Sequence, residues 1–129
     1  MSFARLAPML QVVDVPESID FYTRVLGFRV VDSFPAERPT WAMLERGAVE
    51  LIFTSDGKKK RSMLRLTGVL HIRMLGVLAL HAEIAGRAKV LWGPGVYSYG
   101  MREFAIEDVN GYTLSFGEPT NDPPTAGER

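Results

Sequence analysis

The sequence of 129 residues contains no cysteine. This absence excludes disulfide bonds, thiolate metal sites and cysteine nucleophiles, and it agrees with a cytoplasmic location, where thiols stay reduced. An excess of charge is missing too, because 15 basic and 15 acidic residues give a formal net charge of +0. A neutral chain has no overall field that attracts nucleic acid or an anionic membrane. We therefore expect neither nucleic acid nor a membrane among its partners.

Long apolar stretches are also scarce. The opening residues MSFARLAPML lack the apolar segment of a secretory signal peptide, and no run approaches the roughly 20 residues that cross a bilayer. Hydrophobic residues make up 47% of the chain and charged residues 23%, which is typical of a globular protein with one ordinary core. These observations predict a soluble, cytoplasmic, single-domain protein.

The first half of the chain has the pattern of a strand, a helix and three further strands. Asp14 and Glu17 predict the start of the helix, because Asp14 can cap it and Glu17 has the spacing of a capping box. Gly27 predicts its end. Short apolar or alternating runs predict strands at residues 6–13, 28–34, 41–45 and 49–54.

The second half repeats this order. Its predicted elements are a strand at 69–74, a helix at 77–85, a strand at 88–92 and a hairpin of 101–106 with 112–116. Gly93-Pro94-Gly95 predicts a loop after the third of these elements. Asn110-Gly111 suits a type I′ turn at the tip of the hairpin, which needs two residues with positive φ.

This repeat predicts an α+β fold of two tandem βαβββ modules that form curved mixed sheets around a concave cavity. The predicted boundaries are 6–54 for module one, 55–68 for a linker, 69–117 for module two and 118–129 for a flexible tail. The basic run Lys58–Arg61 lies in the linker. We interpret it as a solvated connection, with a nucleic-acid or targeting patch as the alternative, because the run is short.

The period of two along each strand divides the side chains between a core face and a concave face. In the first module, Leu44, Leu51 and Phe53 are predicted to be core. Their neighbours Trp41, Met43, Glu50 and Ile52 then face the cavity. In the second module, His71, Arg73 and Ser115 are predicted to face it. The alternation does not settle the direction of Glu103.

Aromatic residues are candidates for a stacking pocket. Trp41 lies on the concave side, and Tyr97 and Tyr99 lie in a predicted loop, with Phe34 and Trp92 as further candidates. Aromatic faces bind planar groups and cations. The predicted partner is therefore a small aromatic or cationic ligand.

Two segments carry a resemblance to a known family. Residues 8–28, PMLQVVDVPESIDFYTRVLGF, resemble the opening of the vicinal oxygen chelate superfamily, which contains glyoxalase I, the extradiol dioxygenases and the bleomycin-resistance proteins. Residues 99–119, YGMREFAIEDVNGYTLSFGEP, resemble its closing hairpin in bleomycin-resistance-like members. The resemblance spans about residues 6 to 119 and implies the paired-module fold and a homodimer.

The enzymes of that superfamily hold one divalent metal, and the resemblance places its four ligands at Ala7, Glu50, His71 and Ser115. An alanine cannot bind a metal and a serine is a weak neutral ligand, whereas a catalytic site usually needs three protein ligands. We therefore predict no metal cofactor and no catalytic residues. His71 is interpreted either as a histidine hydrogen-bonded to Glu50 or as a residue lining a ligand pocket.

The favoured function is a metal-independent small-molecule binding protein that resembles the drug-sequestering bleomycin-resistance proteins. One alternative is a metal-dependent glyoxalase-type lyase or dioxygenase with an atypical metal site. Another is a regulatory module with an unrelated ligand. The predicted ligand-binding residues are Trp41, Met43, Glu50, Ile52, His71, Arg73, Tyr97, Tyr99 and Ser115.

Overall fold

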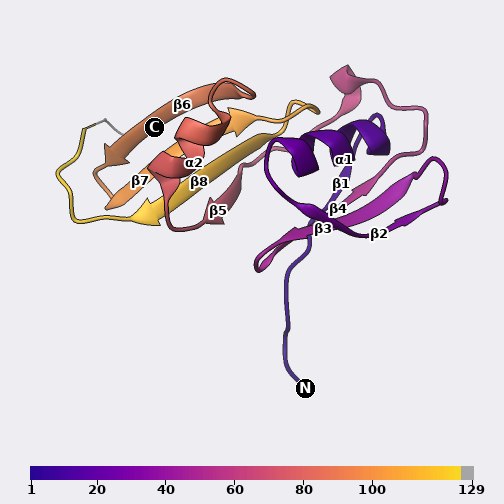
Figure 1. Ribbon diagram of the computed structural model, residues 1–129, viewed down its shortest axis with the longest axis horizontal. Coiled ribbons are helices and arrows are strands. Elements are labelled where there is room, and N and C mark those ends of the chain that lie inside the picture. The colour runs from indigo at the N-terminus through magenta and orange to yellow at the C-terminus, as the bar shows by residue number, and fades with distance from the viewer. Residues whose placement is uncertain (126–129) are drawn as a thin grey trace. The chain divides into compact units, whose positions relative to one another are not determined.

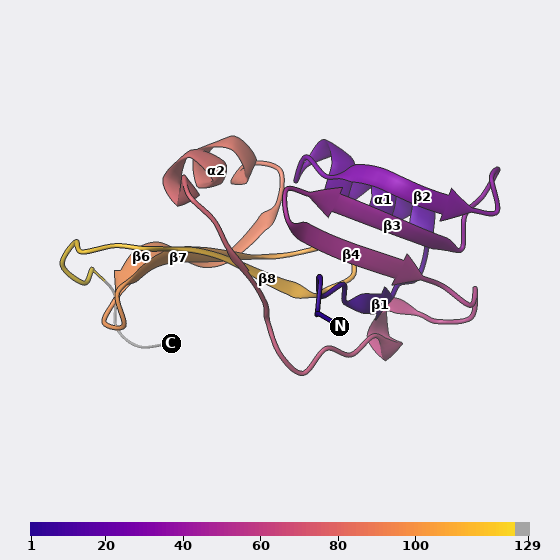
Figure 2. The same ribbon diagram turned by 90° about the horizontal axis from the view of Figure 1, so that it is seen from below.

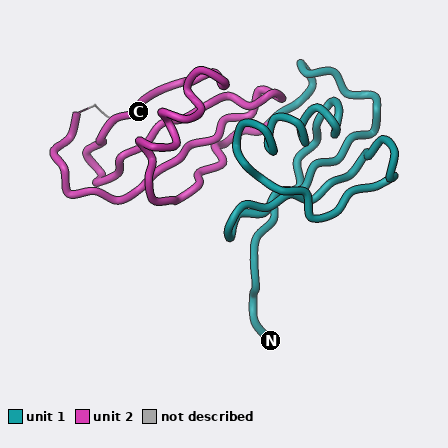
Figure 3. The backbone as a smooth tube through the Cα atoms, viewed as in Figure 1, with its two compact units in different colours: residues 1–65 teal, residues 66–129 magenta. Residues whose placement is uncertain are grey.

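The computed structural model describes residues 1–125, and the chain divides into two compact units, residues 1–65 and 66–129 (Figure 3). The division falls inside the segment predicted to be a linker. Among the described residues, no helix combines the length and the apolar character needed to cross a membrane. Each unit is described below by itself.

Unit 1 contains one helix and a four-stranded mixed sheet (Figure 1). The elements are β1 (Met9–Gln11), α1 (Val15–Arg24), β2 (Arg29–Phe34), β3 (Trp41–Arg46), β4 (Val49–Thr54) and the 3-10 turn η1 (Arg61–Met63). The strand order is β1-β4-β3-β2, with β1 parallel to β4 and the other pairs antiparallel. Helix α1 covers one face of this sheet (Figure 2).

Unit 2 repeats this topology. Its elements are β5 (Leu70–Arg73), α2 (Val77–Ile84), β6 (Lys89–Tyr97), β7 (Met101–Glu107) and β8 (Thr113–Pro119). The strand order is β5-β8-β7-β6, again with the first strand parallel to its neighbour. The predicted α+β fold of two tandem βαβββ modules is therefore confirmed, with two mixed sheets of four strands each.

Each unit has its own core between the helix and the sheet. In unit 1, Tyr22 of α1 is fully buried and lies 4.8 Å, between ring centroids, from Phe53 of β4. In unit 2, the rings of the buried Phe104 and Phe116 lie 5.2 Å apart, between centroids, and pack beneath α2, whose Ile84 is also buried. Each large apolar side chain buried in this way stabilises its unit by about 1.5–3 kcal/mol.

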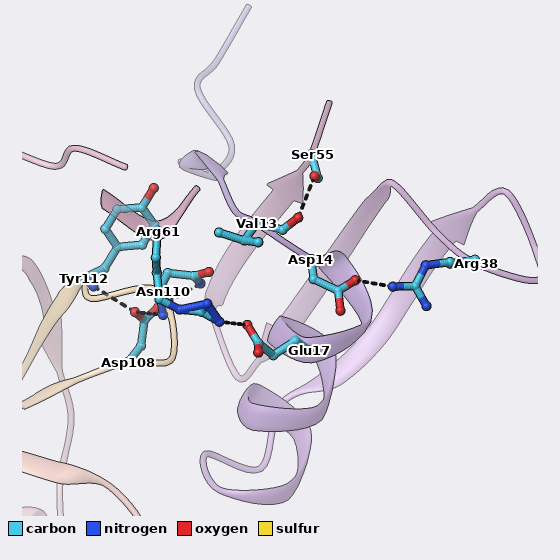
Figure 4. Close-up of polar contacts among 9 residues, drawn as sticks. All are labelled: Val13, Asp14, Glu17, Arg38, Ser55, Arg61, Asp108, Asn110 and Tyr112. Atoms are coloured by element: carbon cyan, nitrogen blue, oxygen red, sulfur yellow. Dashed lines mark hydrogen bonds and ion pairs between the residues drawn. The ribbon is translucent and has the colours of Figure 1, made fainter. Parts of the chain in front are cut away.

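The capping box predicted at the start of α1 is wrong. Asp14 has extended backbone and its carbonyl accepts from the Ser18 amide at 3.1 Å, but its side chain makes no capping bond. The Asp14 carboxylate instead accepts a hydrogen bond from Arg38 at 3.1 Å, and Glu17 pairs with Arg61 (Figure 4). Each of these bonds joins two groups of opposite charge, whereas a capping bond would have a neutral amide as its donor.

The type I′ turn predicted at Asn110-Gly111 is also wrong, because only Gly111 has a positive φ, of 88°. The Gly111 amide donates to the carbonyl of Asp108 at 3.1 Å. One Asp108 carboxylate oxygen accepts from the amides of Asn110 and Tyr112, each at 2.8 Å (Figure 4). An aspartate at the first position of a turn stabilises a type I geometry followed by a left-handed glycine.

Strand β6 is longer than predicted. Gly93-Pro94-Gly95, expected to open a loop, lies inside the strand, and the register against β7 shifts on both sides of Trp92. A bulge gives the strand the irregular pairing that glycine and proline require, because proline cannot donate to the ladder. The strand therefore continues through a sequence that normally breaks one.

The predicted flexible tail begins too early. Glu118 and Pro119 continue β8. The Thr120 amide donates to the carbonyl of Gly100 at 3.0 Å, and the Thr125 amide donates to the carbonyl of Val96 at 2.8 Å. Residues 120–125 are therefore tied to β6 and to the turn after it, while residues 126–129 lie outside the described residues.

Candidate ligand-binding site

Each sheet has one face toward its helix and one face opposite to it, which we call the open face. On β3 and β4 the buried residues Ala42, Leu44, Leu51 and Phe53 point toward α1. The alternate residues Trp41, Met43, Glu50 and Ile52 lie on the open face of unit 1 and are half-buried. This facing is the one predicted from the period of two.

The open face of unit 1 carries apolar side chains in two neighbouring rows of register partners, although each row also contains a polar residue, Asp32 opposite Met43 and Thr54 opposite Trp41. Trp41 and Phe34 are register partners, and their rings stack with centroids 4.8 Å apart at an angle of 8°. In the next row, Ile52 pairs with Met43 on one side and with Met9 on the other. Phe34 is 53% exposed and Met9 is 60% exposed, so the surface accepts further apolar contact.

A third row of the same face is charged. Glu50 pairs in register with Glu45, and each carboxylate has an arginine partner. Arg5 lies 3.6 Å from Glu50, and Arg29 pairs with Glu45. The Glu50 carboxylate thus already has a cationic partner within its own unit. Ala7, the other family metal position in unit 1, offers only a methyl group.

The other two family metal positions belong to unit 2. His71 and Ser115 are register partners, and the Ser115 hydroxyl lies 3.2 Å from Nδ1 of His71. Ser115 is 1% exposed. The imidazole lies over Gly117, since a Cβ built on that glycine would be 2.9 Å from Cε1 of His71. Beside it on β5, Arg73 is exposed and pairs in register with Gly117.

These four positions do not fit a divalent metal. An alanine methyl, a carboxylate paired with arginine, an imidazole and a serine hydroxyl hydrogen-bonded to that imidazole do not supply the three donors of a catalytic site. Within residues 1–125, no three His, Asp or Glu side chains lie close enough together to hold an ion. The absence of a metal cofactor stays a prediction.

Aromatic side chains also stack at one end of the open face of unit 2. The rings of Tyr97 and Tyr99 lie 5.7 Å apart, between centroids, at an angle of 9°. Tyr97 is 5% exposed and Tyr99 is 47% exposed. Tyr99 stands in the turn between β6 and β7, which is closed by a bond of 3.0 Å from the Gly100 amide to the carbonyl of Tyr97.

Sequence reasoning left the direction of Glu103 open, and the structure buries this residue on β7, where it is 1% exposed. The Tyr99 hydroxyl donates a hydrogen bond of 2.7 Å to Oε1 of this carboxylate. Both neighbours of Glu103 in the register are glycines, Gly95 on β6 and Gly117 on β8. Phe104 on the opposite face is buried against α2, so Glu103 belongs to the open face. Nearly every residue of β7 is buried, so the strand shows no alternation that would reveal the direction of Glu103. The glycines on both paired strands were the sequence feature that could have indicated it.

Among the comparisons with known proteins, a family model identifies the family and solved structures show the fold. The family model of the "Glyoxalase/Bleomycin resistance protein/Dioxygenase superfamily" matches residues 3–116. A search of curated protein sequences gave no match. Solved structures share the fold at identities below 25%.

Three of these structures serve as examples. TioX from Micromonospora sp. ML1 superposes with a TM-score of 0.76 at 18% identity, covering 91% of this chain and 99% of that one. The bleomycin-binding protein from bleomycin-producing Streptomyces verticillus, complexed with copper(II)-bleomycin, superposes with a TM-score of 0.68 at 22% identity, covering 95% of this chain and 99% of that one. TnmS3, an antibiotic-binding protein from Streptomyces sp. CB03234, superposes with a TM-score of 0.72 at 21% identity, covering 93% of this chain and 99% of that one.

Proposed function

This chain belongs to the Glyoxalase/Bleomycin resistance protein/Dioxygenase superfamily, and we propose that within it the protein binds a small aromatic or cationic molecule without a metal. The observation that carries this proposal is the pair of aromatic stacks on the open faces. Phe34 with Trp41 and Tyr97 with Tyr99 each present a partly exposed ring.

The exposed rings suit a flat ligand for a physical reason. A pair of stacked rings is already ordered, so a third planar group can extend the stack without further loss of side-chain freedom. Each aromatic or cation–π contact contributes about 0.5–2 kcal/mol. Several such contacts, together with the apolar surface of Met43 and Ile52, are consistent with affinities near micromolar, which need about 8 kcal/mol.

Two of the similar structures guide the choice of probe. One is of a protein that binds bleomycin and another of a protein that binds an antibiotic. With identities of 22% and 21%, these structures support a shared fold, and the ligand of this chain has to be established by binding. We infer a homodimer from the family resemblance, which light scattering on the purified protein tests directly, and a cytoplasmic location from the lack of cysteine.

The test is a titration of the full chain with metal-free bleomycin and with 9-aminoacridine, a planar cationic dye, followed by fluorescence and thermal shift. We expect at least one probe to bind near micromolar affinity and Trp41→Ala to weaken it about tenfold. Leu78→Ala is the matched control, because Leu78 is exposed on α2 rather than on an open face. Binding that is indifferent to Trp41→Ala would place the ligand elsewhere.

Metal independence is tested on the same preparation. The expected metal content is far below one ion per chain, and added Zn²⁺, Ni²⁺ or Fe²⁺ leaves probe affinity unchanged. A stoichiometry near one per chain that disappears in Glu50→Ala or His71→Ala would instead favour the metal-dependent lyase or dioxygenase.

A further inference from the structure

Extending the binding role proposed above, on which this inference rests, we propose that residues 120–125 form a strap that holds the turn between β6 and β7. The strap thereby keeps Tyr97 and Tyr99 in a stacked arrangement that is ready for a ligand. Asp122 and Thr125 are then positioning residues, which act on the ligand through the two tyrosines and do not touch it.

The tyrosine stack depends on the backbone of this turn. Tyr97 ends β6 and Tyr99 stands two residues later in the turn, so their rings stay 5.7 Å apart at 9° only while the backbone between them keeps its shape. Gly100 follows with a φ of 81°, and glycine has more backbone freedom than any other residue. A segment that restrains the turn therefore also preserves the stack.

The strap first fastens the side of the turn that leads into β7. The Thr120 amide donates to the carbonyl of Gly100 at 3.0 Å, and the Asp122 carboxylate accepts a hydrogen bond from Arg102. The Asp122 amide also donates to the Thr120 hydroxyl at 3.1 Å, so both contacts belong to one bend of the strap. Figure 1 shows the chain after β8 curving round this end of the sheet toward β6.

The other end of the strap fastens the side of the turn that comes from β6. The Val96 amide donates to the Thr125 hydroxyl, and the Thr125 amide donates to the Val96 carbonyl, each at 2.8 Å. Val96 and Arg102 are register partners, so the strap holds both strands at the same level of the hairpin. Pro123 and Pro124 stiffen the link between the two anchors, because proline fixes φ, and they have no N–H that needs a partner.

The ion pair of the strap lies on the side of the sheet opposite to the stack. Val96 and Arg102 form one row with Glu118, whose carboxylate caps α2, so this row faces the helix. Tyr97 is the next residue along β6 and therefore lies on the open face. Asp122 thus restrains the turn from behind the surface that we propose to bind the ligand.

The bond between Tyr99 and Glu103 has a different effect from the strap. It fixes the hydroxyl of the ring at 2.7 Å from the carboxylate, whereas the strap restrains the backbone that carries the ring. Together they order the exposed ring before a ligand arrives, and such preorganisation lowers the entropic cost of binding. Loosening the strap should therefore weaken binding although it removes no contact with the ligand.

The experiment loosens the strap in the full chain with the double variant Asp122→Ala/Thr125→Ala. The first readout is hydrogen exchange at the Gly100 amide, followed by NMR, because this amide donates to the Tyr97 carbonyl at 3.0 Å and belongs to the turn itself. We expect exchange to become about two- to tenfold faster, the factor by which an ordinary hydrogen bond shifts an equilibrium. The second readout is the affinity for 9-aminoacridine, which we expect to fall about two- to fivefold.

Conservative and matched variants serve as controls. Asp122→Glu and Thr125→Ser keep the carboxylate and the hydroxyl, so we expect them to retain most of the slow exchange and of the affinity. Asp20→Ala removes a carboxylate of nearly the same exposure, 61% against 60% for Asp122, from an ion pair with Arg24 on α1, and should change neither readout. Circular dichroism verifies the fold of each variant. Thr125→Ala alone repeats both measurements, so the comparison survives if the double variant does not fold.

The possible failures are distinguishable. If exchange at Gly100 is unchanged in the loosened variants, the strap does not hold the turn and the proposal is wrong. If exchange is faster but 9-aminoacridine binds as before, the positioning role is wrong while the binding role stands. If neither 9-aminoacridine nor metal-free bleomycin binds the unaltered protein, the binding role fails and the positioning role fails with it.

Discussion

The replacement Gly93→Ala tests how closely the backbone of β6 approaches that of β7 at Glu103 and Phe104. Gly93 has φ of +79°, in the left-handed region that side chains other than glycine rarely adopt. A Cβ at this position would lie 2.4 Å from the carbonyl oxygen of Glu103 and 2.9 Å from Cα of Phe104. Real Cβ contacts essentially never fall below 3.0 Å. The main chain of β6 or β7 must therefore move.

The expected cost has two parts. The left-handed conformation costs an alanine about 1–2 kcal/mol. Pushing the packed backbone at Glu103 and Phe104 away adds about 1–3 kcal/mol, as overpacking generally does. Gly111→Ala is the matched control, because Gly111 has φ of +88° and a Cβ added there would meet no atom within 4 Å, so it incurs only the first part.

The assay is urea unfolding followed by Trp92 fluorescence in a Trp41→Phe background, so that the signal comes from unit 2. With a urea dependence of about 1–3 kcal/mol/M, we expect the midpoint of Gly93→Ala to fall about 1 M below that of Gly111→Ala. Equal midpoints for the two variants would refute the argument that close backbone approach requires glycine at position 93.

Two further predictions concern unit 2. The Glu118 carboxylate on β8 caps α2, because it accepts hydrogen bonds from the amides of Gly76 and Val77 at 3.0 and 3.3 Å. We expect Glu118→Ala to lower the free energy of unfolding in urea by about 1 kcal/mol, and Glu118→Gln to restore part of it. No change in Glu118→Ala would mean that water serves the amides equally well. Burial, and then the charge of Asp108, raise the pKa of Tyr112 above 10.0, so folding favours the neutral phenol. That contribution is complete below pH 10 and is lost as pH rises through the higher folded pKa. Ultraviolet titration should show a late-ionising tyrosine whose pKa falls in Asp108→Asn, and an unchanged titration curve in that variant would contradict the role of Asp108.

Most of the fold could be predicted because strand alternation and helix signals agree. The buried Leu44, Leu51 and Phe53 alternate with half-buried residues, so hydrophobic spacing alone identified the face of the unit 1 sheet that packs against α1. The hairpin of β3 and β4 turns at Gly47, whose φ is 57°, between the strands predicted at 41–45 and 49–54. Such elements are determined by local pattern and burial together.

The errors arose where a distant partner decides the local structure. Asp14 lost its capping role because Arg38, 24 residues away, binds its carboxylate. Glu118 was assigned to a tail although its carboxylate caps α2 from 42 residues away. The direction of Glu103 could not be predicted because its environment depends on residues in two other strands. No local window contains these partners.

The repeated topology shows how two similar sheets can acquire different chemistry. If the modules are aligned so that the family positions Glu50 and Ser115 coincide, the pair Met43 and Ile52 of unit 1 corresponds to Glu103 and Gly117 of unit 2. The same two places on the open face thus hold two bulky apolar side chains in one unit and a buried carboxylate beside a glycine in the other.

This difference predicts that the open face of unit 1 binds by contact area rather than by charge at these two places. Met43→Ala removes contact area without a charge, so it should weaken 9-aminoacridine and its neutral parent acridine by the same factor if Met43 contacts the dye. A Met43 variant that weakens only one of the two dyes, measured in the same fluorescence titration, would contradict this assignment.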